Sequence, residues 1–127
     1  MLDPEIRDLA QGKNFAGFTT LGPTGHPATH VMWVDADDEH LLINTELDRQ
    51  KTKNVMKDPR VAVMIWEGAN PYRYAEVRGR VVDIVRGPRA RAHIDELSRK
   101  YMDHDYTNPI GSERVILVIE PTRQRAR

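Results

Sequence analysis

The chain has 127 residues, a typical length for one domain, and its 19 Lys and Arg residues balance 19 Asp and Glu residues to a formal net charge of +0 at pH 7. This balance gives no global electrostatic case for nucleic acid, so an anionic partner would have to bind a local cluster of cations. Cysteine is absent, which excludes disulfides and cysteine nucleophiles, and no apolar run approaches the roughly 20 residues that span a bilayer, so we expect a cytoplasmic protein that does not enter a membrane.

The first half of the chain predicts one short helix and three strands. Asp3 followed by Pro4 is typical of a helix start, and the helix is expected to end near residue 11. Strands are predicted at residues 15–21, 28–34 and 40–45, separated by a Gly- and Pro-rich turn and by the polar turn 35–39. Their order and their short links favour an antiparallel meander.

The segment after the third strand carries the strongest functional signal. Residues 48–54 read Asp-Arg-Gln-Lys-Thr-Lys-Asn, at the start of a helix predicted over residues 49–57. A helix N-terminus accepts an anion because it offers unpaired backbone N–H groups and the positive end of a dipole. Arg49 and Lys51 add the planar fork and the point charge that bind a phosphate. We interpret the segment as a docking site for a phosphorylated cofactor; the alternative is the solvated face of an amphipathic helix, because Arg49, Lys53 and Lys57 recur every four residues.

The second half predicts three more strands and one helix. An apolar run over residues 61–66 fits a core strand, and a longer run over residues 72–85 contains Gly79, which indicates a bend or bulge. A helix is predicted over residues 88–101, a loop over 103–113 and a last strand over 115–119, followed by a basic tail that is expected to be frayed. We therefore predict a mainly β fold, a six-stranded antiparallel barrel with short flanking helices that forms a single domain over residues 1–127.

Several short motifs, in their order and spacing, resemble a known family. The chain contains Gly-His-Pro at residues 25–27, Leu-Ile-Asn-Thr at 42–45, Arg-x-Lys-x-x-Asn at 49–54, Asp-Pro-Arg at 58–60 and Asn-Pro-Tyr-Arg-Tyr-x-Glu-Val-Arg-Gly-Arg-Val at 70–81. Together they resemble the split β-barrel flavin/deazaflavin family that takes its name from pyridoxamine 5′-phosphate oxidase, over residues 3–121. The segment 71–81 is most similar to the actinobacterial branch that uses coenzyme F420, a deazaflavin.

The resemblance implies a homodimer with two cofactor sites between the barrels. It implies that the cofactor phosphate is held by Arg49, Lys51 and Lys53. The tricyclic ring is expected against the second and third strands, at His30, Val31, Met32, Trp33, Val34, Ile43, Asn44 and Thr45. The partner chain is expected to close the pocket with Pro71, Tyr72 and Tyr74.

The activity that the resemblance implies is that of an F420-dependent oxidoreductase, which transfers a hydride from reduced deazaflavin to an electron-poor double bond such as that of an enone or a quinone. The cofactor performs the difficult step, so the protein has to position it and exclude water. Met32, Trp33 and Trp66 would provide an apolar wall for that task. Candidates for the proton donor are Tyr72, Tyr74 and His30, and solvent is an alternative.

Other functions stay open at this point. The C-terminal residues 119–127 lack the Arg-x-His motif that would suit pyridoxamine phosphate, and we favour the deazaflavin over FMN. The alternatives are an FMN-binding oxidase or flavin reductase on the same barrel, and a non-catalytic protein that binds flavin or haem. His26 and His30 lie on a turn and a strand rather than on a helix, so we expect no metal site. The tail cations could meet the polyglutamate tail of the deazaflavin; they are Arg123, Arg125 and Arg127.

Overall fold

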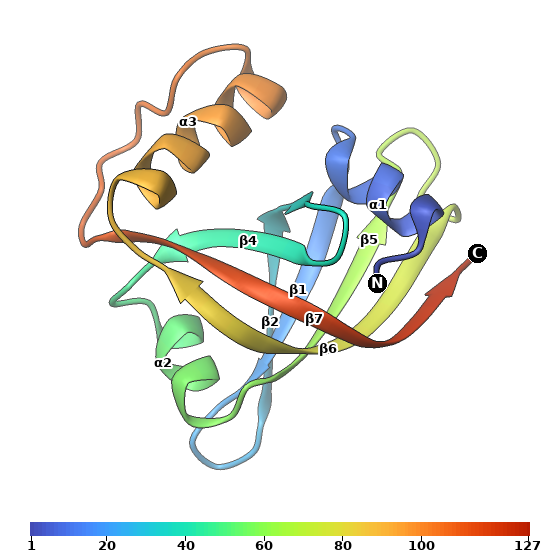
Figure 1. Cartoon of the computed structure of the whole chain (residues 1–127), viewed down its shortest axis with the longest axis horizontal. Helices are drawn as coiled ribbons and strands as arrows, with labels where there is room; N and C mark the ends of the chain where they lie inside the picture. The colour runs from blue at the N-terminus through green and yellow to red at the C-terminus, as the bar shows by residue number, and fades with distance from the viewer.

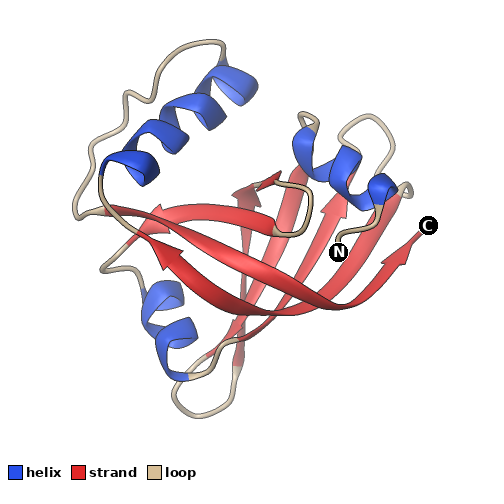
Figure 2. Cartoon of the chain, viewed as in Figure 1, coloured by secondary structure: helices blue, strands red, loops and turns tan.

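The computed structural model describes all 127 residues. One antiparallel sheet of seven strands, in the order β2-β1-β5-β6-β7-β4-β3, curls into a half-open barrel flanked by three helices (Figure 1, Figure 2). The predicted mainly β class is therefore confirmed. The strands are β1 (Phe15–Leu21), β2 (Pro27–Trp33), β3 (Asp35–Ala36), β4 (Leu41–Glu46), β5 (Arg60–Trp66), β6 (Tyr74–Val85) and β7 (Arg114–Ala126), and the helices are α1 (Pro4–Gln11), α2 (Gln50–Lys57) and α3 (Pro88–Met102).

The sheet has seven strands rather than the predicted six, because Asp35 and Ala36 form β3 instead of part of a polar turn. They pair with Leu42 and Leu41 of β4. Asp35 tolerates its half-buried position because its carboxylate is fully engaged. It accepts a hydrogen bond from the backbone N–H of Ala36 at 2.8 Å and one from Nε2 of His93 on α3 at 2.9 Å.

The predicted meander is correct only for its first hairpin. β1 pairs with β2, whereas β4 pairs along its length with β7. The chain turns at Val34, which is fully buried and separates β2 from β3. Although they are neighbours in the sequence, β2 and β3 form the two opposite edges of the sheet. As a result β4 lies well inside the fold, and all six of its residues are buried.

The last strand is much longer than predicted, because the basic tail is paired rather than frayed. β7 continues to Ala126 and pairs with β6 on both sides of a register shift at Gly79 and Pro121. Pro121 lacks an N–H group, and a bulge is one of the few places in a sheet that accept this. Beyond it, Gln124 accepts a hydrogen bond from the backbone of Asp3 and donates one to the carbonyl oxygen of Met1, so the two ends of the chain hold each other.

The main core fills the interior of the barrel. Alternate residues of the strands point inward, as in β1, where Ala16 and Phe18 are fully buried, and β5, where Val63 and Ile65 are. Helix α1 covers one end of the barrel and contributes Ile6, Leu9 and Ala10 to the same cluster (Figure 1). None of the three helices is long and apolar enough to cross a membrane.

Helix α3 lies outside the barrel, over β4 and β7 (Figure 1). Ile94, Leu97 and Tyr101 form its own small apolar cluster, which includes Trp33 at the end of β2. The rings of Trp33 and Tyr101 are stacked, with centroids 5.0 Å apart and an interplanar angle of 3°. Between α3 and β4 this second layer encloses two polar residues, Asn44 and His93.

Candidate functional site

The strongest local charge lies where β4, α2 and β7 meet. Arg49 is the N-cap residue of α2, and no side chain caps that helix. Its guanidinium lies 3.7 Å from a carboxylate oxygen of Glu46, the last residue of β4. Arg114, the first residue of β7, lies 3.5 Å from the same carboxylate oxygen and is only 8% exposed. Lys51, one half-turn into α2, is half-buried beside both arginines.

This arrangement, the cation cluster of Arg49, Lys51 and Arg114, has an excess of positive charge. Burial lowers the pKa of Lys51, and the charges of Arg49 and Arg114 lower it further, which places the three groups within electrostatic range of one another. Burial acts to raise the pKa of Glu46, but hydrogen bonds from Ser112 and Gly111 and the neighbouring arginines hold it below its ordinary value. One ionised carboxylate thus faces three cations, and an added anion would be stabilised there.

A pocket of about 230 Å³ adjoins the cation cluster and shares Arg114 with it. Val31, Met32 and Trp33 line it from β2, and Asn44 lines it from β4. The remaining wall comes from α3 and from the loop that follows it, through Ile94, Tyr106 and Asn108. The pocket therefore brings residues of both predicted ring-binding segments together with Arg114 of the cation cluster.

The alternation of side chains along each strand explains why only some of the predicted ring-binding residues line this pocket. Val34 and Ile43 are fully buried in the barrel core and lie outside the pocket lining. Thr45 is 4% exposed and lies outside the pocket lining. His30 is exposed on β2, beyond the pocket. Trp66 is likewise absent from the lining and packs against Phe15 of β1.

Lys53 lies apart from the other two predicted phosphate ligands. It is exposed and lines a different pocket of about 520 Å³ between α2 and the β1–β2 turn, together with Gly25 and Lys57. Residues that are two positions apart on a helix differ by about 200° around its axis, so Lys51 and Lys53 face different directions. Of the predicted phosphate ligands, the structure brings together Arg49 and Lys51.

The predicted closing segment lies in and beside the loop between β5 and β6. Pro71 and Tyr72 are exposed, Tyr72 at 86%, and Tyr74 begins β6 opposite Trp66. None of them lines the pocket beside Arg114 within the same chain.

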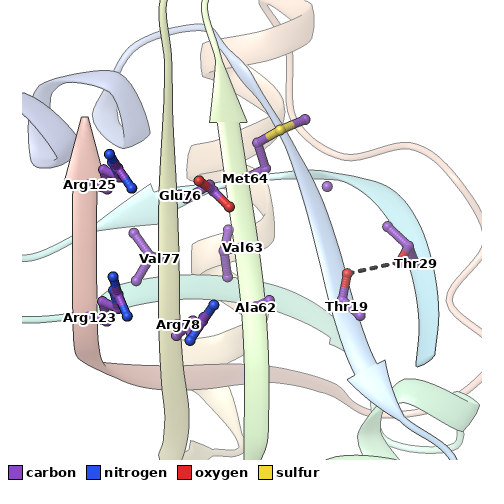
Figure 3. Close-up of a pocket in the computed structure, with 11 residues that line it drawn as sticks. Thr19, Thr29, Ala62, Val63, Met64, Glu76, Val77, Arg78, Arg123 and Arg125 are labelled. Carbon is purple, nitrogen blue, oxygen red and sulfur yellow. Dashed lines mark hydrogen bonds between the residues drawn. The ribbon is translucent and has the colours of Figure 1, made fainter. Parts of the chain in front are cut away.

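The outer face of the sheet carries a separate, arginine-lined pocket of about 360 Å³ (Figure 3). Arg78 of β6 lies directly opposite Arg123 of β7, and Glu76 lies opposite Arg125. None of these four side chains forms an ion pair. On the same face Thr19 and Thr29 share a hydrogen bond of 2.8 Å between their hydroxyl oxygens (Figure 3). The basic tail residues are therefore held in place on a strand.

Two functional candidates were not found from the sequence. Arg114 directly precedes the apolar run of the last strand, and nothing in the sequence separates it from the other basic residues around it. His93 lies on α3 and is fully buried. A signal did exist for His93, because it occupies the same helical stripe as Ala90, Leu97 and Tyr101.

Comparisons with known proteins agree with this architecture. A family model described as pyridoxamine 5′-phosphate oxidase matches residues 2–127. Among solved structures, the chain is similar to a protein described as an F420 reductase, with 34% sequence identity, 98% of each chain covered and a TM-score of 0.84. It is also similar to the conserved hypothetical protein Rv2991 from Mycobacterium tuberculosis, with 26% identity, 99% of this chain and 84% of that chain covered, and a TM-score of 0.74.

A more distant likeness shows the fold alone. HupZ from Group A Streptococcus is 16% identical, with 99% of this chain and 94% of that chain covered and a TM-score of 0.69. A comparison with curated protein sequences finds no match.

Proposed function

This chain belongs to the pyridoxamine 5′-phosphate oxidase family, and we propose that it is an F420-dependent oxidoreductase that passes a hydride from reduced deazaflavin to an electron-poor double bond, such as that of an enone or a quinone. The similarity to a protein described as an F420 reductase supports this choice within the family. The observation that carries the proposal is the continuity of the cation cluster with the pocket that contains Trp33.

Arg49, Lys51 and Arg114 would hold the phosphate of the cofactor. The residues fit that group because a single carboxylate, Glu46, partly neutralises the three cations. The uncapped N-terminus of α2 adds the positive end of a helix dipole to the same place. Burial and then repulsion from Arg49 and Arg114 lower the pKa of Lys51, and a phosphate bound there would relieve the repulsion.

Met32 and Trp33 would hold the ring of the cofactor, with Asn44 as a polar contact at the floor of the pocket. When bound, the deazaflavin supplies the hydride. Trp33 is held rigidly for this role, because it stacks on Tyr101 and meets Tyr106 edge-on, with ring centroids 6.3 Å apart. A fixed apolar wall orients the reacting carbons and excludes water, and orientation alone can supply several kcal/mol of the barrier.

A second copy of the chain would complete the site. The pocket beside Arg114 measures about 230 Å³ and is open to solvent in one chain, so other residues have to cover a bound ring. We assign this role to Pro71, Tyr72 and Tyr74 of another copy. Exposed apolar side chains on the outer face of the sheet support a twofold dimer, since Val31 of β2 is 68% exposed and Met64 of β5 is 43% exposed. Tyr72 and Tyr74 would then be the candidates for the proton donor, with His30 or solvent as alternatives.

The arginine-lined pocket of Figure 3 would bind an acidic tail of the cofactor across such a dimer. Within one chain, Arg123 lies roughly 30 Å along β7 from Arg114 at about 3.3 Å per residue, which is far from the proposed phosphate. Arg78 and Arg123 are like charges directly opposite each other, an arrangement that costs energy until an anion neutralises it.

A paired cofactor titration tests the proposed function. We expect the protein to quench the fluorescence of F420 and to give no response to FMN. FMN retained through purification would favour the alternative, an FMN-binding oxidase or flavin reductase on the same barrel. Turnover then distinguishes an enzyme from a binding protein. A protein that holds reduced F420 without consuming it, whichever enone or quinone is supplied, would be a non-catalytic carrier.

A further inference from the structure

A row of buried hydrogen bonds connects helix α3 to the cation cluster. Nε2 of His93 lies 2.9 Å from Oδ2 of Asp35, and Nδ1 of His93 lies 3.1 Å from Nδ2 of Asn44. On its other side, Oδ1 of Asn44 accepts a hydrogen bond of 2.9 Å from Nε of Arg114. Arg114 then meets Glu46. His93 is fully buried, and Asn44 is 4% exposed.

The partners of Asn44 fix the direction of every bond in this row. Nδ2 of Asn44 also donates to the carbonyl oxygen of Ala90 at 3.0 Å, and a carbonyl can only accept. The amide nitrogen therefore faces α3 and the amide oxygen faces Arg114. His93 must accept at Nδ1, so its proton is on Nε2, where it donates to Asp35.

Asp35 suits the end of this row. Burial acts to raise the pKa of its carboxyl, but the hydrogen bonds from His93 and Ala36 and the charge of Lys100 hold that pKa below its ordinary value. An ionised Asp35 is an acceptor only, which locks the His93 ring in the tautomer that Asn44 requires. The same logic orients histidines in many sites through a carboxylate behind the ring.

We infer that His93 is a positioning residue, which holds the Asn44 amide so that its oxygen anchors Arg114 in the cation cluster. Without the ring nitrogen as an acceptor, one of the two N–H groups of the Asn44 amide loses its buried partner, and only the Ala90 carbonyl then keeps the amide from turning its oxygen away from Arg114. Arg114 would then keep only Glu46 and the face of Tyr106, whose ring centroid lies 5.3 Å from the guanidinium carbon. The inference rests on the proposed function in one respect, that the anion held by Arg114 is a cofactor phosphate.

Two substitutions separate positioning from folding. His93→Gln keeps an acceptor and a donor on one side chain, so it can serve both Asn44 and Asp35. His93→Phe keeps a planar ring and removes both hydrogen bonds. His104→Phe is the matched control, because His104 is exposed and the one hydrogen bond of its ring is to the backbone carbonyl oxygen of Asp105.

The first measurement needs no cofactor. Long-range ¹H–¹⁵N NMR spectra of the wild type are expected to show His93 protonated on Nε2, with a slowly exchanging Nε–H signal from Arg114. We expect His93→Phe to shift that signal and speed its exchange, His93→Gln to restore it and His104→Phe to leave it unchanged. An Arg114 signal that is insensitive to His93→Phe in a folded protein overturns the positioning role.

The second measurement is the dissociation constant for F420 and for FMN, taken on the same variants. His93→Phe should raise the dissociation constant of the cofactor about tenfold, which corresponds to one charge-assisted hydrogen bond. His93→Gln should restore the wild-type dissociation constant. An unchanged dissociation constant in His93→Phe would mean that the hydrogen bonds from Asp35 through His93 and Asn44 to Arg114 do not contribute to cofactor binding. A wild type that binds neither cofactor would instead overturn the proposed function, and the NMR result would still decide whether His93 positions Arg114.

Discussion

Glu46 and Arg114 form a buried ion pair of 3.5 Å in which each side chain is only 8% exposed. The pair is not self-contained, because Arg49 and Lys51 add two further cations beside it. Lys51 is half-buried, and partly buried charge without a matching partner is costly, so this imbalance supports our proposal that the site binds an anion. If the cluster binds a phosphate, substitutions within it should change both the affinity for the cofactor and the free energy of unfolding.

Arg49→Ala and Lys51→Ala should each weaken cofactor binding by about 1.5–3 kcal/mol, the usual contribution of a charge-assisted hydrogen bond. Fluorescence titration with F420 measures the dissociation constants. Lys57→Ala is the matched control, because Lys57 is exposed on the same helix and lines the other pocket. Equal affinity for the wild type and both site variants would refute the phosphate assignment.

Lys53→Ala tests the one predicted phosphate ligand that lies apart from the cluster. Lys53 is exposed and lines the pocket between α2 and the β1–β2 turn, so we expect a loss of binding energy of less than about 1 kcal/mol, the range of a screened surface charge. The same titration measures it. A loss as large as that of Lys51→Ala would show that the phosphate sits on the other side of α2.

The positions of most helices and strands were predictable from the sequence, because long apolar runs and the Gly and Pro residues beside them are strong local signals. The expected bend at Gly79 is a real register shift, and α1 begins at Pro4 as its Asp-Pro start predicts. What local pattern could not reveal is pairing between distant segments. Arg123 and its neighbours read as a polar tail, but they extend β7 because β6 offers a free edge. In the site, Arg49 and Lys51 were predictable from their spacing at a helix start, whereas Arg114 reaches them only through tertiary structure.

Gly79→Ala should destabilise the protein by about 1–3 kcal/mol, the usual cost of forced overpacking. An added Cβ at this position would lie 2.6 Å from the carbonyl oxygen of Glu120 and 2.8 Å from Cγ2 of Ile119. Because the nearer atom belongs to the backbone of β7, the bulge itself would have to shift. Urea unfolding measures the change. Gly68→Ala is the control, because nothing lies within 4 Å of its added Cβ, and it should stay within about 0.5 kcal/mol of the wild type.

Glu46→Gln should lower the free energy of unfolding by about 1–3 kcal/mol at pH 7 and by less in acid. The pKa of Glu46 lies below its model-compound value of 4.5 in the folded protein, so its ionised form stabilises the fold above about pH 4.5. That contribution is lost as the pH falls through the lower folded pKa. Unfolding curves from pH 7 down to pH 3 should therefore converge for wild type and variant. Parallel curves over this range would contradict an ionised, stabilising Glu46.

The dimer is tested by mass in solution. Light scattering at micromolar concentration should give about twice the chain mass of 14.6 kDa. Met64→Asp, on the exposed outer face of β5, should shift the mass toward the monomer because it places a charge in the covered face. Met102→Asp is the control, since Met102 is 53% exposed at the end of α3 and is not part of the sheet. A wild-type mass near 14.6 kDa would rule out a stable dimer.

Mixed dimers test whether each site combines residues of two chains. At an F420 concentration a few times the wild-type dissociation constant, Arg49→Ala should leave a site largely empty through the chain that holds the phosphate, and Tyr72→Ala should do so through the chain that closes the pocket. When the two variants are mixed and allowed to exchange subunits, half of the dimers are mixed, and one of the two sites in each contains both native residues. About a quarter of the wild-type binding capacity for F420 should therefore return, although each variant alone has almost none. If Arg49 and Tyr72 acted within one chain, mixing would restore nothing, because every site would still carry one of the two substitutions.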